Sequence, residues 1–225
     1  LPSSSMGDII SNIPGVYQST TGAGLAKPVI RGLSLNRVIT YLNGLRIENQ
    51  QWGGDHGIGV TDLGIGRVEV IKGPASLLYG SDALGGVLFF ADEQFAINNS
   101  LEASAGSKFE SVSLGHNSNI GFKYSKSNFR INLHANHMSH ADYKMPNGLY
   151  GKDSRFWAQN IKGAIGLNKG NWVSTLRYNF LRNRVGIPGH THESEIHPED
   201  FQVTVQNRQE NVPAQANQNH YALWE

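Results

Sequence analysis

Histidines and carboxylates gather in one polar stretch near the C-terminal end of the chain, at positions 190–200. Imidazole and carboxylate groups without thiolates form a ligand set suited to zinc or copper. The alternative is a solvated polar loop that binds metal only weakly, as any His-rich tract does. We take five side chains as candidate metal ligands: His190, His192, Glu193, Glu195 and His197. Glu199 and Asp200 add two further carboxylates to the same stretch.

A second group of reactive side chains lies in the segment NQQWGGDHG, positions 49–57. Trp52 could stack on a flat ligand, and Asp55 with His56 could ligate a metal or accept hydrogen bonds. The alternative is a turn in which Asp55 bonds its own backbone while Trp52 packs against the fold. Both interpretations stay open.

His134, His137 and His140 lie close together, but we expect hydrogen-bonding side chains there rather than metal ligands. The alternation of apolar and polar residues lapses at His137. No Gly-rich phosphate loop and no Gly-x-Ser-x-Gly elbow occurs in the chain. We therefore predict that the protein is not an enzyme.

The segment 66–87, GRVEVIKGPASLLYGSDALGGV, holds the clearest local structure of the first ninety residues. Its alternation at 67–71 predicts a strand, Pro74 opens a helical turn over 75–79, and Gly80 ends that turn. Upstream, apolar runs flank Asn43-Gly44, which is the strongest short hairpin signal because both turn positions need positive φ. A capping box at 5–8 predicts a helix that Pro14 ends.

From Asn98 onward the sequence alternates with a period of two residues. Phe129, Ile131 and Leu133 share one face of a predicted strand, against polar residues on the other face. Further strands of this kind include 120–124, 157–168 and 172–180. Strands of about nine or more residues with one apolar and one polar face are typical of a barrel wall between lipid and water. Tight turns at 125–128 and 168–171 separate longer links near 106–113, 139–155 and 183–217.

This register predicts about six strands, whereas membrane barrels with a plugged lumen have about 22. Six strands cannot close, and an open edge in lipid is costly. We expect the chain to be the N-terminal part of a longer protein, with any export signal upstream. With 19 basic and 18 acidic residues, its charge does not favour nucleic acid. The lack of cysteine fits an exported bacterial β-protein.

Three features carry a resemblance to a known family: the 66–87 segment, the "IRG" at 30–32 and the YLNGLRI hairpin. In matching order over residues 4–87, they resemble the plug (cork) domain of TonB-dependent outer-membrane receptors. The chain departs from that family at Asn43, where Asp is usual, and at 88–92, where LFFAD replaces the more usual Asn-Ile continuation. The segment EVIKGP at 69–74 resembles the corresponding segment of receptors for iron complexes, haem, vitamins and metals. It differs from the version found in the SusC-like glycan importers.

The resemblance implies an α+β plug at 1–93 and the first barrel strands at 94–225, in the outer membrane of a Gram-negative bacterium. It implies TonB-dependent import of a scarce metal or metal chelate: zinc, copper, an iron-siderophore or haem. No resident cofactor is required, and TonB would contact a segment upstream of Leu1. Apical plug loops touch substrate in this family, which favours Trp52, Asp55 and His56, and 190–200 resembles a His-rich outer loop of its zinc-uptake members.

The competing hypothesis is a soluble β-rich ligand- or carbohydrate-binding protein with an α+β front domain. It requires the row of Phe129, Ile131 and Leu133 to be buried in a core.

Overall fold

The structure is a computed structural model that describes residues 10–22, 25–47, 61–188 and 200–225. The chain forms two compact units, Leu1–Gln94 and Phe95–Glu225. Strands dominate both units, and within the described ranges no helix is long and apolar enough to cross a membrane.

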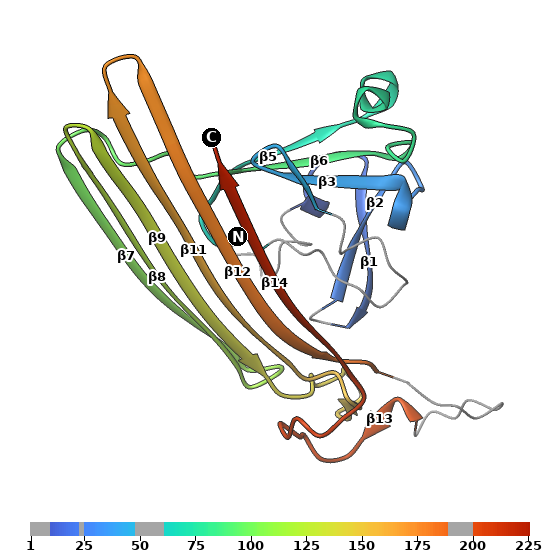
Figure 1. Ribbon diagram of the computed structural model, residues 1–225. Coiled ribbons are helices and arrows are strands. Elements are labelled where there is room, and N and C mark those ends of the chain that lie inside the picture. The colour runs from blue at the N-terminus through green and yellow to red at the C-terminus, as the bar shows by residue number, and fades with distance from the viewer. Residues whose placement is uncertain (1–9, 23–24, 48–60, 189–199) are drawn as a thin grey trace. The chain divides into compact units, whose positions relative to one another are not determined.

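The first unit is built on a four-stranded sheet with the order β4-β3-β6-β5. Its strands are β3 (Val38–Leu42), β4 (Leu45–Ile47), β5 (Ile65–Ile71) and β6 (Gly86–Asp92). A separate antiparallel pair, β1 (Val16–Gly22) and β2 (Leu25–Ile30), precedes it. The described part also contains two 3-10 helices, η1 (Leu35–Arg37) and η2 (Gly73–Tyr79), and Ile10 and Ser11 are helical. Figure 1 shows β3, β6 and β5 lying side by side.

The strand β6 is one of the two central strands of this sheet. It pairs in parallel with β3 and antiparallel with β5, and the side chains of Val87, Leu88 and Phe90 are fully buried. Residues 88–92, the LFFAD segment that departs from the family pattern, form most of this strand. An almost continuous apolar run is typical of a strand covered on both faces, and here LFFAD lies inside the four-stranded sheet.

The double glycine before β6 allows this strand to lie close to its neighbours. A Cβ added at Gly85 would lie 2.9 Å from the carbonyl oxygen of Arg37, and one added at Gly86 would lie 2.8 Å from that of Ile71. Gly86 also has a φ of 149°, which side-chain-bearing residues rarely adopt. The glycines therefore serve strand packing as well as chain bending.

The predicted hairpin at Asn43-Gly44 is confirmed, with φ values of 50° and 83°. Asn43 also holds the end of β6. Its Nδ2 donates to Asp92 Oδ2 at 2.9 Å, and its Oδ1 accepts the backbone N–H of Asp92 at 2.9 Å. The two departures from the family pattern are therefore one structural pair, because an aspartate at position 43 would face the Asp92 carboxylate.

We expect Asn43→Asp to destabilise the first unit by about 2 kcal/mol, since it replaces a hydrogen bond to a charged acceptor with like-charge repulsion. Urea unfolding of the purified protein measures the change. The double variant Asn43→Asp/Asp92→Asn is the matched control, and it should recover most of the loss. Equal stability of Asn43→Asp and the parent would contradict this account of the pair.

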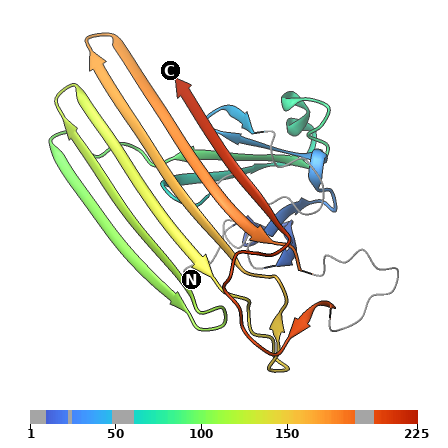
Figure 2. The same cartoon turned by 60° about the horizontal axis from the view of Figure 1, so that its bottom comes forward.

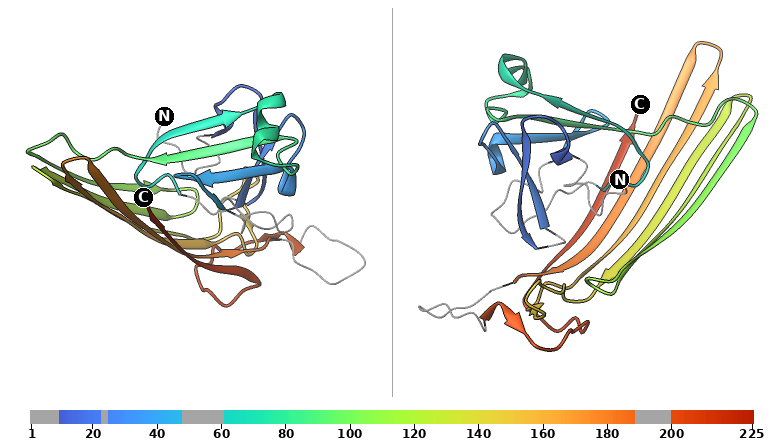
Figure 3. Two further views of the ribbon diagram at one scale, coloured as in Figure 1. Left: turned by 45° about the horizontal axis from the view of Figure 1, so that its top comes forward. Right: turned by 180° about the vertical axis from the view of Figure 1, so that it is seen from behind.

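The second unit is a six-stranded antiparallel sheet with the order β14-β12-β11-β9-β8-β7. Its long strands are β7 (Ser100–Glu110), β8 (Gly115–Lys126), β9 (Phe129–His140), β11 (Phe156–Lys169), β12 (Trp172–Gly186) and β14 (Ala214–Trp224). They lie side by side and curve together in both views of Figure 3. The predicted count of six strands is confirmed.

Two details of the predicted strands are wrong. The link expected near 106–113 is shorter, because β7 continues to Glu110 and only 111–114 form the turn. The strand also continues past His137, where the alternation lapses in the sequence, because β9 keeps an unbroken register from Phe129 to His140. Both errors arise because polar strand ends beyond an apolar face carry no hydrophobic alternation, although their backbone pairing continues.

One face of this sheet carries an apolar band. The register aligns Leu101, Tyr124, Ile131, Ile165, Leu176 and Trp224 in a single row. The two following rows contain Leu133 and Ile161 among other uncharged residues. The band is exposed: 61% of Leu101, 45% of Leu133 and 51% of Ile161 are accessible. Exposed apolar rows do not fit the core that the soluble alternative requires, and they fit a lipid-facing surface.

The opposite face is polar and is joined across strands by side-chain hydrogen bonds. Asn136 donates to Asn117 on β8 and accepts from Asn160 on β11 at 3.2 Å. Glu102 and Lys123 form an ion pair of 3.4 Å farther along the same face. Such cross-strand amide and charge pairs stabilise a sheet face that contacts water.

Candidate functional site

The side chains that the sequence favours lie outside the described residues. This holds for Trp52, Asp55 and His56, and equally for His190, His192, Glu193, Glu195 and His197. In the described ranges, no three His, Cys, Asp or Glu side chains come together as a metal site. The structure does describe the residues on both sides of the segment 189–199, and we call the region that holds them the platform.

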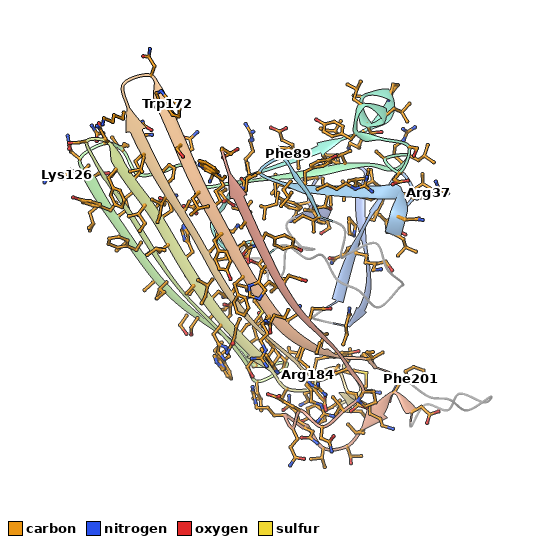
Figure 4. All side chains as sticks on the ribbon, in the orientation of Figure 1. Arg37, Phe89, Lys126, Trp172, Arg184 and Phe201 are labelled. Carbon is orange, nitrogen blue, oxygen red and sulfur yellow. The ribbon has the colours of Figure 1, made fainter. Side chains whose placement is uncertain are left out.

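That platform lies at one end of the six-stranded sheet, which we call the long-loop end. Here the segments 111–114, 141–155, 187–188 and 200–213 meet, and we call them the loop body. Figure 2 shows 200–213 beside 141–155 at this end. The opposite, short-turn end has only the turns 127–128 and 170–171. Figure 4 places Arg184 and Phe201 at the long-loop end and Lys126 and Trp172 at the short-turn end.

A buried ion pair forms the centre of the loop body. Asp142 is fully buried, and its Oδ1 lies 3.2 Å from Nε of Arg155 and accepts the Arg155 backbone N–H at 3.1 Å. Arg155 also donates to Asp153 at 2.6 Å. Burial raises the pKa of the Asp142 carboxyl, and the adjacent Arg155 guanidinium opposes that rise.

Backbone hydrogen bonds around this pair join the loops to one another. The N–H of Asp142 donates to Asn207, that of Ala141 to Ser113, and that of Lys144 to Val112. The side chain of Gln206 donates to the carbonyl of Asp142 at 2.7 Å. Three connections that are distant in sequence therefore form one hydrogen-bonded body.

Residues on both sides of 189–199 are held in this body. On the N-terminal side, the N–H of Ile187 donates to Pro213 at 3.0 Å. On the C-terminal side, Phe201 accepts from Lys152 at 2.8 Å, and the short strand β13 (Gln202–Val203) pairs with β10 (Tyr150–Gly151). The His-rich segment thus starts and ends at anchored residues.

Two further arginines connect strand ends to the loop body. Arg184 donates to the carbonyl oxygens of Glu210 and Val212, at 3.0 and 3.1 Å from Nη2. Arg208 donates to Ser139 Oγ at 2.8 Å and to the carbonyl of Leu114. A pocket of about 250 Å³ lies between them, and its lining includes Trp157 and Glu210. The acceptors of both guanidiniums are neutral oxygens, so their positive charge is not compensated by these contacts.

The three predicted strand histidines separate onto opposite faces. His134 and His140 lie on the polar face, whereas His137 lies on the other face beside His116, with ring centroids 5.3 Å apart. His140 bonds Ser113 Oγ through Nδ1 at 2.8 Å and stacks on Phe156 at 4.4 Å. For His140 the hydrogen-bonding interpretation is confirmed.

Sequence reasoning missed the residues that organise this end of the sheet. Asp142 and Arg155 lie in a predicted loop, and Arg184 and Arg208 are separated by the His-rich segment. An isolated Asp or Arg in a polar loop has no periodicity that would reveal its burial or its partner.

Comparison with known proteins covers both units. Residues 1–87 match the TonB-dependent receptor plug domain family. The chain is 38% identical over 113 residues to the vitamin B12 transporter BtuB of Vibrio vulnificus, covering 48% of this chain and 16% of that protein. It is 36% identical over 85 residues to BtuB of Photobacterium profundum, covering 37% and 14%. The chain therefore spans less than a fifth of the length of either relative.

Solved structures with the same arrangement of strands include two transport proteins. The copper transporter OprC has a TM-score of 0.73 at 20% identity, over 84% of this chain and 30% of that one. The ferric enterobactin receptor PfeA of Pseudomonas aeruginosa has a TM-score of 0.63 at 19% identity, over 88% and 34%. At these identities the likeness establishes the fold.

Proposed function

Because this chain belongs to the family of TonB-dependent outer-membrane receptors, we propose that it is part of an active importer of a small metal-containing substrate across the outer membrane. The observation that carries the proposal is the match of residues 1–87 to the plug family, followed by a six-stranded sheet with an exposed apolar band. A plug joined to a lipid-facing wall is the arrangement that gated import requires.

In this proposal residues 1–93 act as the plug and 94–225 as the first strands of a longer barrel. Energy arrives from TonB, which contacts a segment upstream of Leu1. Catalysis is not part of the function, because importing a substrate requires binding and release rather than bond cleavage. No resident cofactor is needed, since the metal or metal complex is the substrate.

Uptake by living cells tests this function. Cells that express the full-length protein should accumulate the labelled substrate only while TonB is present, and zinc, copper, a ferric siderophore and vitamin B12 should each be offered as candidate substrates. Accumulation that is unchanged after deletion of TonB would contradict the proposal. Similarity to a vitamin B12 transporter supports including vitamin B12 among these candidates.

Two groups of residues are the proposed substrate contacts. Trp52, Asp55 and His56 would touch substrate from the plug side. The second group captures metal from outside: His190, His192, Glu193, Glu195 and His197. The anchoring of Ile187 and Phe201 in the loop body supports this role, because fixed attachment points lower the entropic cost of bringing ligands to one metal.

We expect the variant His190→Ala/His192→Ala/His197→Ala to bind zinc at least about tenfold more weakly than the parent, because three imidazole ligands are lost. Calorimetric titration of the full-length protein with zinc measures the affinity. The matched control is His116→Ala/His137→Ala/His220→Ala, which removes three strand histidines and should leave the affinity unchanged. Equal affinities for the parent and the loop variant would exclude the loop from metal capture.

A further inference from the structure

On the polar face of the six-stranded sheet, side-chain carboxamides are concentrated in two neighbouring rows. The register aligns one row from Lys108 to Asn217 and the next from Gly106 to Asn219, with one residue from each long strand in each row. Seven of these twelve positions are asparagines: Asn117, Asn119, Asn136, Asn160, Asn183, Asn217 and Asn219. We call these seven side chains the amide wall, and it lies in the half of the face nearer to the loop body.

The amide wall offers no free charge to a ligand. Lys108 is the one charged residue among the twelve positions, and its Nζ lies 2.8 Å from the Glu110 carboxylate. The other positions that are not asparagine hold glycine or apolar residues. A charged ligand therefore meets no uncompensated counter-charge in these rows, and bringing a charge out of water without such a partner is costly.

Hydrogen bonds between carboxamides fix the orientation of several of these side chains. Asn160 donates to Asn136 Oδ1 at 3.2 Å, and Asn136 in turn donates to Asn117 Oδ1. Asn217 donates to Asn183 Oδ1 at 3.1 Å. Because the first chain runs in one direction, it ends in a carboxamide oxygen at Asn160, which accepts no hydrogen bond from the described residues. An unpaired carbonyl oxygen of this kind gains from a ligand that supplies a donor.

Two asparagines of the wall keep both of their hydrogen-bonding groups available. Within the described ranges, no side-chain hydrogen bond occupies the carboxamide of Asn119 on β8 or that of Asn219 on β14. Asn119 is exposed and Asn219 is half-buried. Each carboxamide can donate through its nitrogen and accept through its oxygen. The wall thus presents mixed donors and acceptors without charge.

We propose that the amide wall binds the uncharged organic periphery of the imported substrate, which is then a neutral metal chelate bearing amide or hydroxyl groups. Amides and hydroxyls both donate and accept, so they match a surface of carboxamides. Bare zinc or copper ions prefer imidazole or thiolate ligands, and an anionic complex is bound most strongly by guanidinium or ammonium groups. Neither need is met by the seven asparagines.

This inference rests on the proposed import function and adds the chemical class of the substrate. It concerns the organic part of that substrate, whereas the His-rich segment is proposed to contact its metal.

The first test compares probes of different charge in the TonB-dependent uptake assay. The neutral probes are vitamin B12 and the ferric complex of a cyclic hexapeptide tris-hydroxamate. The charged probes are the zinc ion, the copper ion and the trianionic ferric complex of a tris-catecholate. We expect a neutral probe to accumulate and the charged probes to stay outside.

The uptake results separate this inference from the import function. TonB-dependent accumulation of a charged probe would overturn the inference and leave the import function intact. If no probe accumulates in a TonB-dependent manner, the import function fails, and the inference fails with it.

The second test is calorimetric titration of the full-length protein with the neutral probe that accumulates, vitamin B12 or the ferric hydroxamate. Asn119→Asp/Asn219→Asp keeps the size of both side chains but replaces two N–H donors with negative charges. This variant should bind the probe at least about tenfold more weakly than the parent. The matched control is Asn128→Asp/Asn171→Asp, which adds the same charges in the two short turns and should bind as the parent does.

Unchanged affinity in Asn119→Asp/Asn219→Asp, or an equal loss in the control, would show that the amide wall does not contact the substrate. If the aspartate variant fails to assemble, Asn119→Ser/Asn219→Ser takes its place, because it removes both carboxamides without adding charge. That variant should also weaken binding, and an affinity equal to that of the parent would overturn the proposal.

Discussion

Replacing Leu133 by Arg should prevent stable insertion of the protein into a bilayer. Leu133 lies in the middle row of the exposed apolar band, where a charged side chain meets hydrocarbon. A charge at the midplane of a barrel wall costs about 2–4 kcal/mol, which is a large part of the net stability of most proteins. Urea unfolding of the full-length protein from lipid vesicles measures the loss.

Gln159→Arg is the matched control for this experiment. Gln159 projects from the same face of the neighbouring strand, but it lies in the polar row beyond the band. At interfacial depth the same substitution should cost about 0–1 kcal/mol. Equal effects of the two substitutions would show that the apolar band does not face lipid.

Removing the Asp142 carboxylate should open the loop body. Asp142→Ala leaves the buried guanidinium of Arg155 with Asp153 as its remaining carboxylate, and breaking a buried ion pair costs about 3–5 kcal/mol. Since the backbone bonds around Asp142 join the connections, we expect faster cleavage by trypsin after Lys144 and Lys152. Gel electrophoresis of a digestion time course measures the rate.

A double-mutant cycle separates the pair from general damage. Asp142→Ala/Arg155→Leu removes both charges, so its cleavage rate should lie below the rate expected from the two single variants added together. Fully additive effects would mean that the two side chains do not interact. Unchanged cleavage in Asp142→Ala would mean that the pair does not hold the loops.

Much of the fold could be predicted because its signals are local or periodic. The Asn43-Gly44 turn follows from two residues that tolerate positive φ, and the six long strands follow from the alternation of residues such as Phe129, Ile131 and Leu133. Neither inference needs knowledge of distant contacts. The order of residues 1–87 added the resemblance to a plug domain, which the family match confirms.

Other features could not be predicted because they depend on partners far away in the sequence. The parallel pairing of β3 with β6 joins segments separated by β4, β5 and η2, and it makes LFFAD part of a largely buried strand. The continuation of β7 and β9 into polar residues likewise depends on backbone pairing with neighbours. The candidate ligands at 52–56 and 190–197 lie outside the described residues, so for them the sequence prediction stands untested.

The sequence by itself determined which face of each long strand is apolar, because side chains of a strand alternate between two faces whatever its neighbours are. It also determined that histidines and carboxylates are concentrated in one segment. The tertiary structure decided what surrounds that segment: the Asp142–Arg155 pair, the anchored residues Ile187 and Phe201, and the arginines beside Trp157. These depend on the strand register, which aligns residues from six segments into common rows and is set only when all the strands pair.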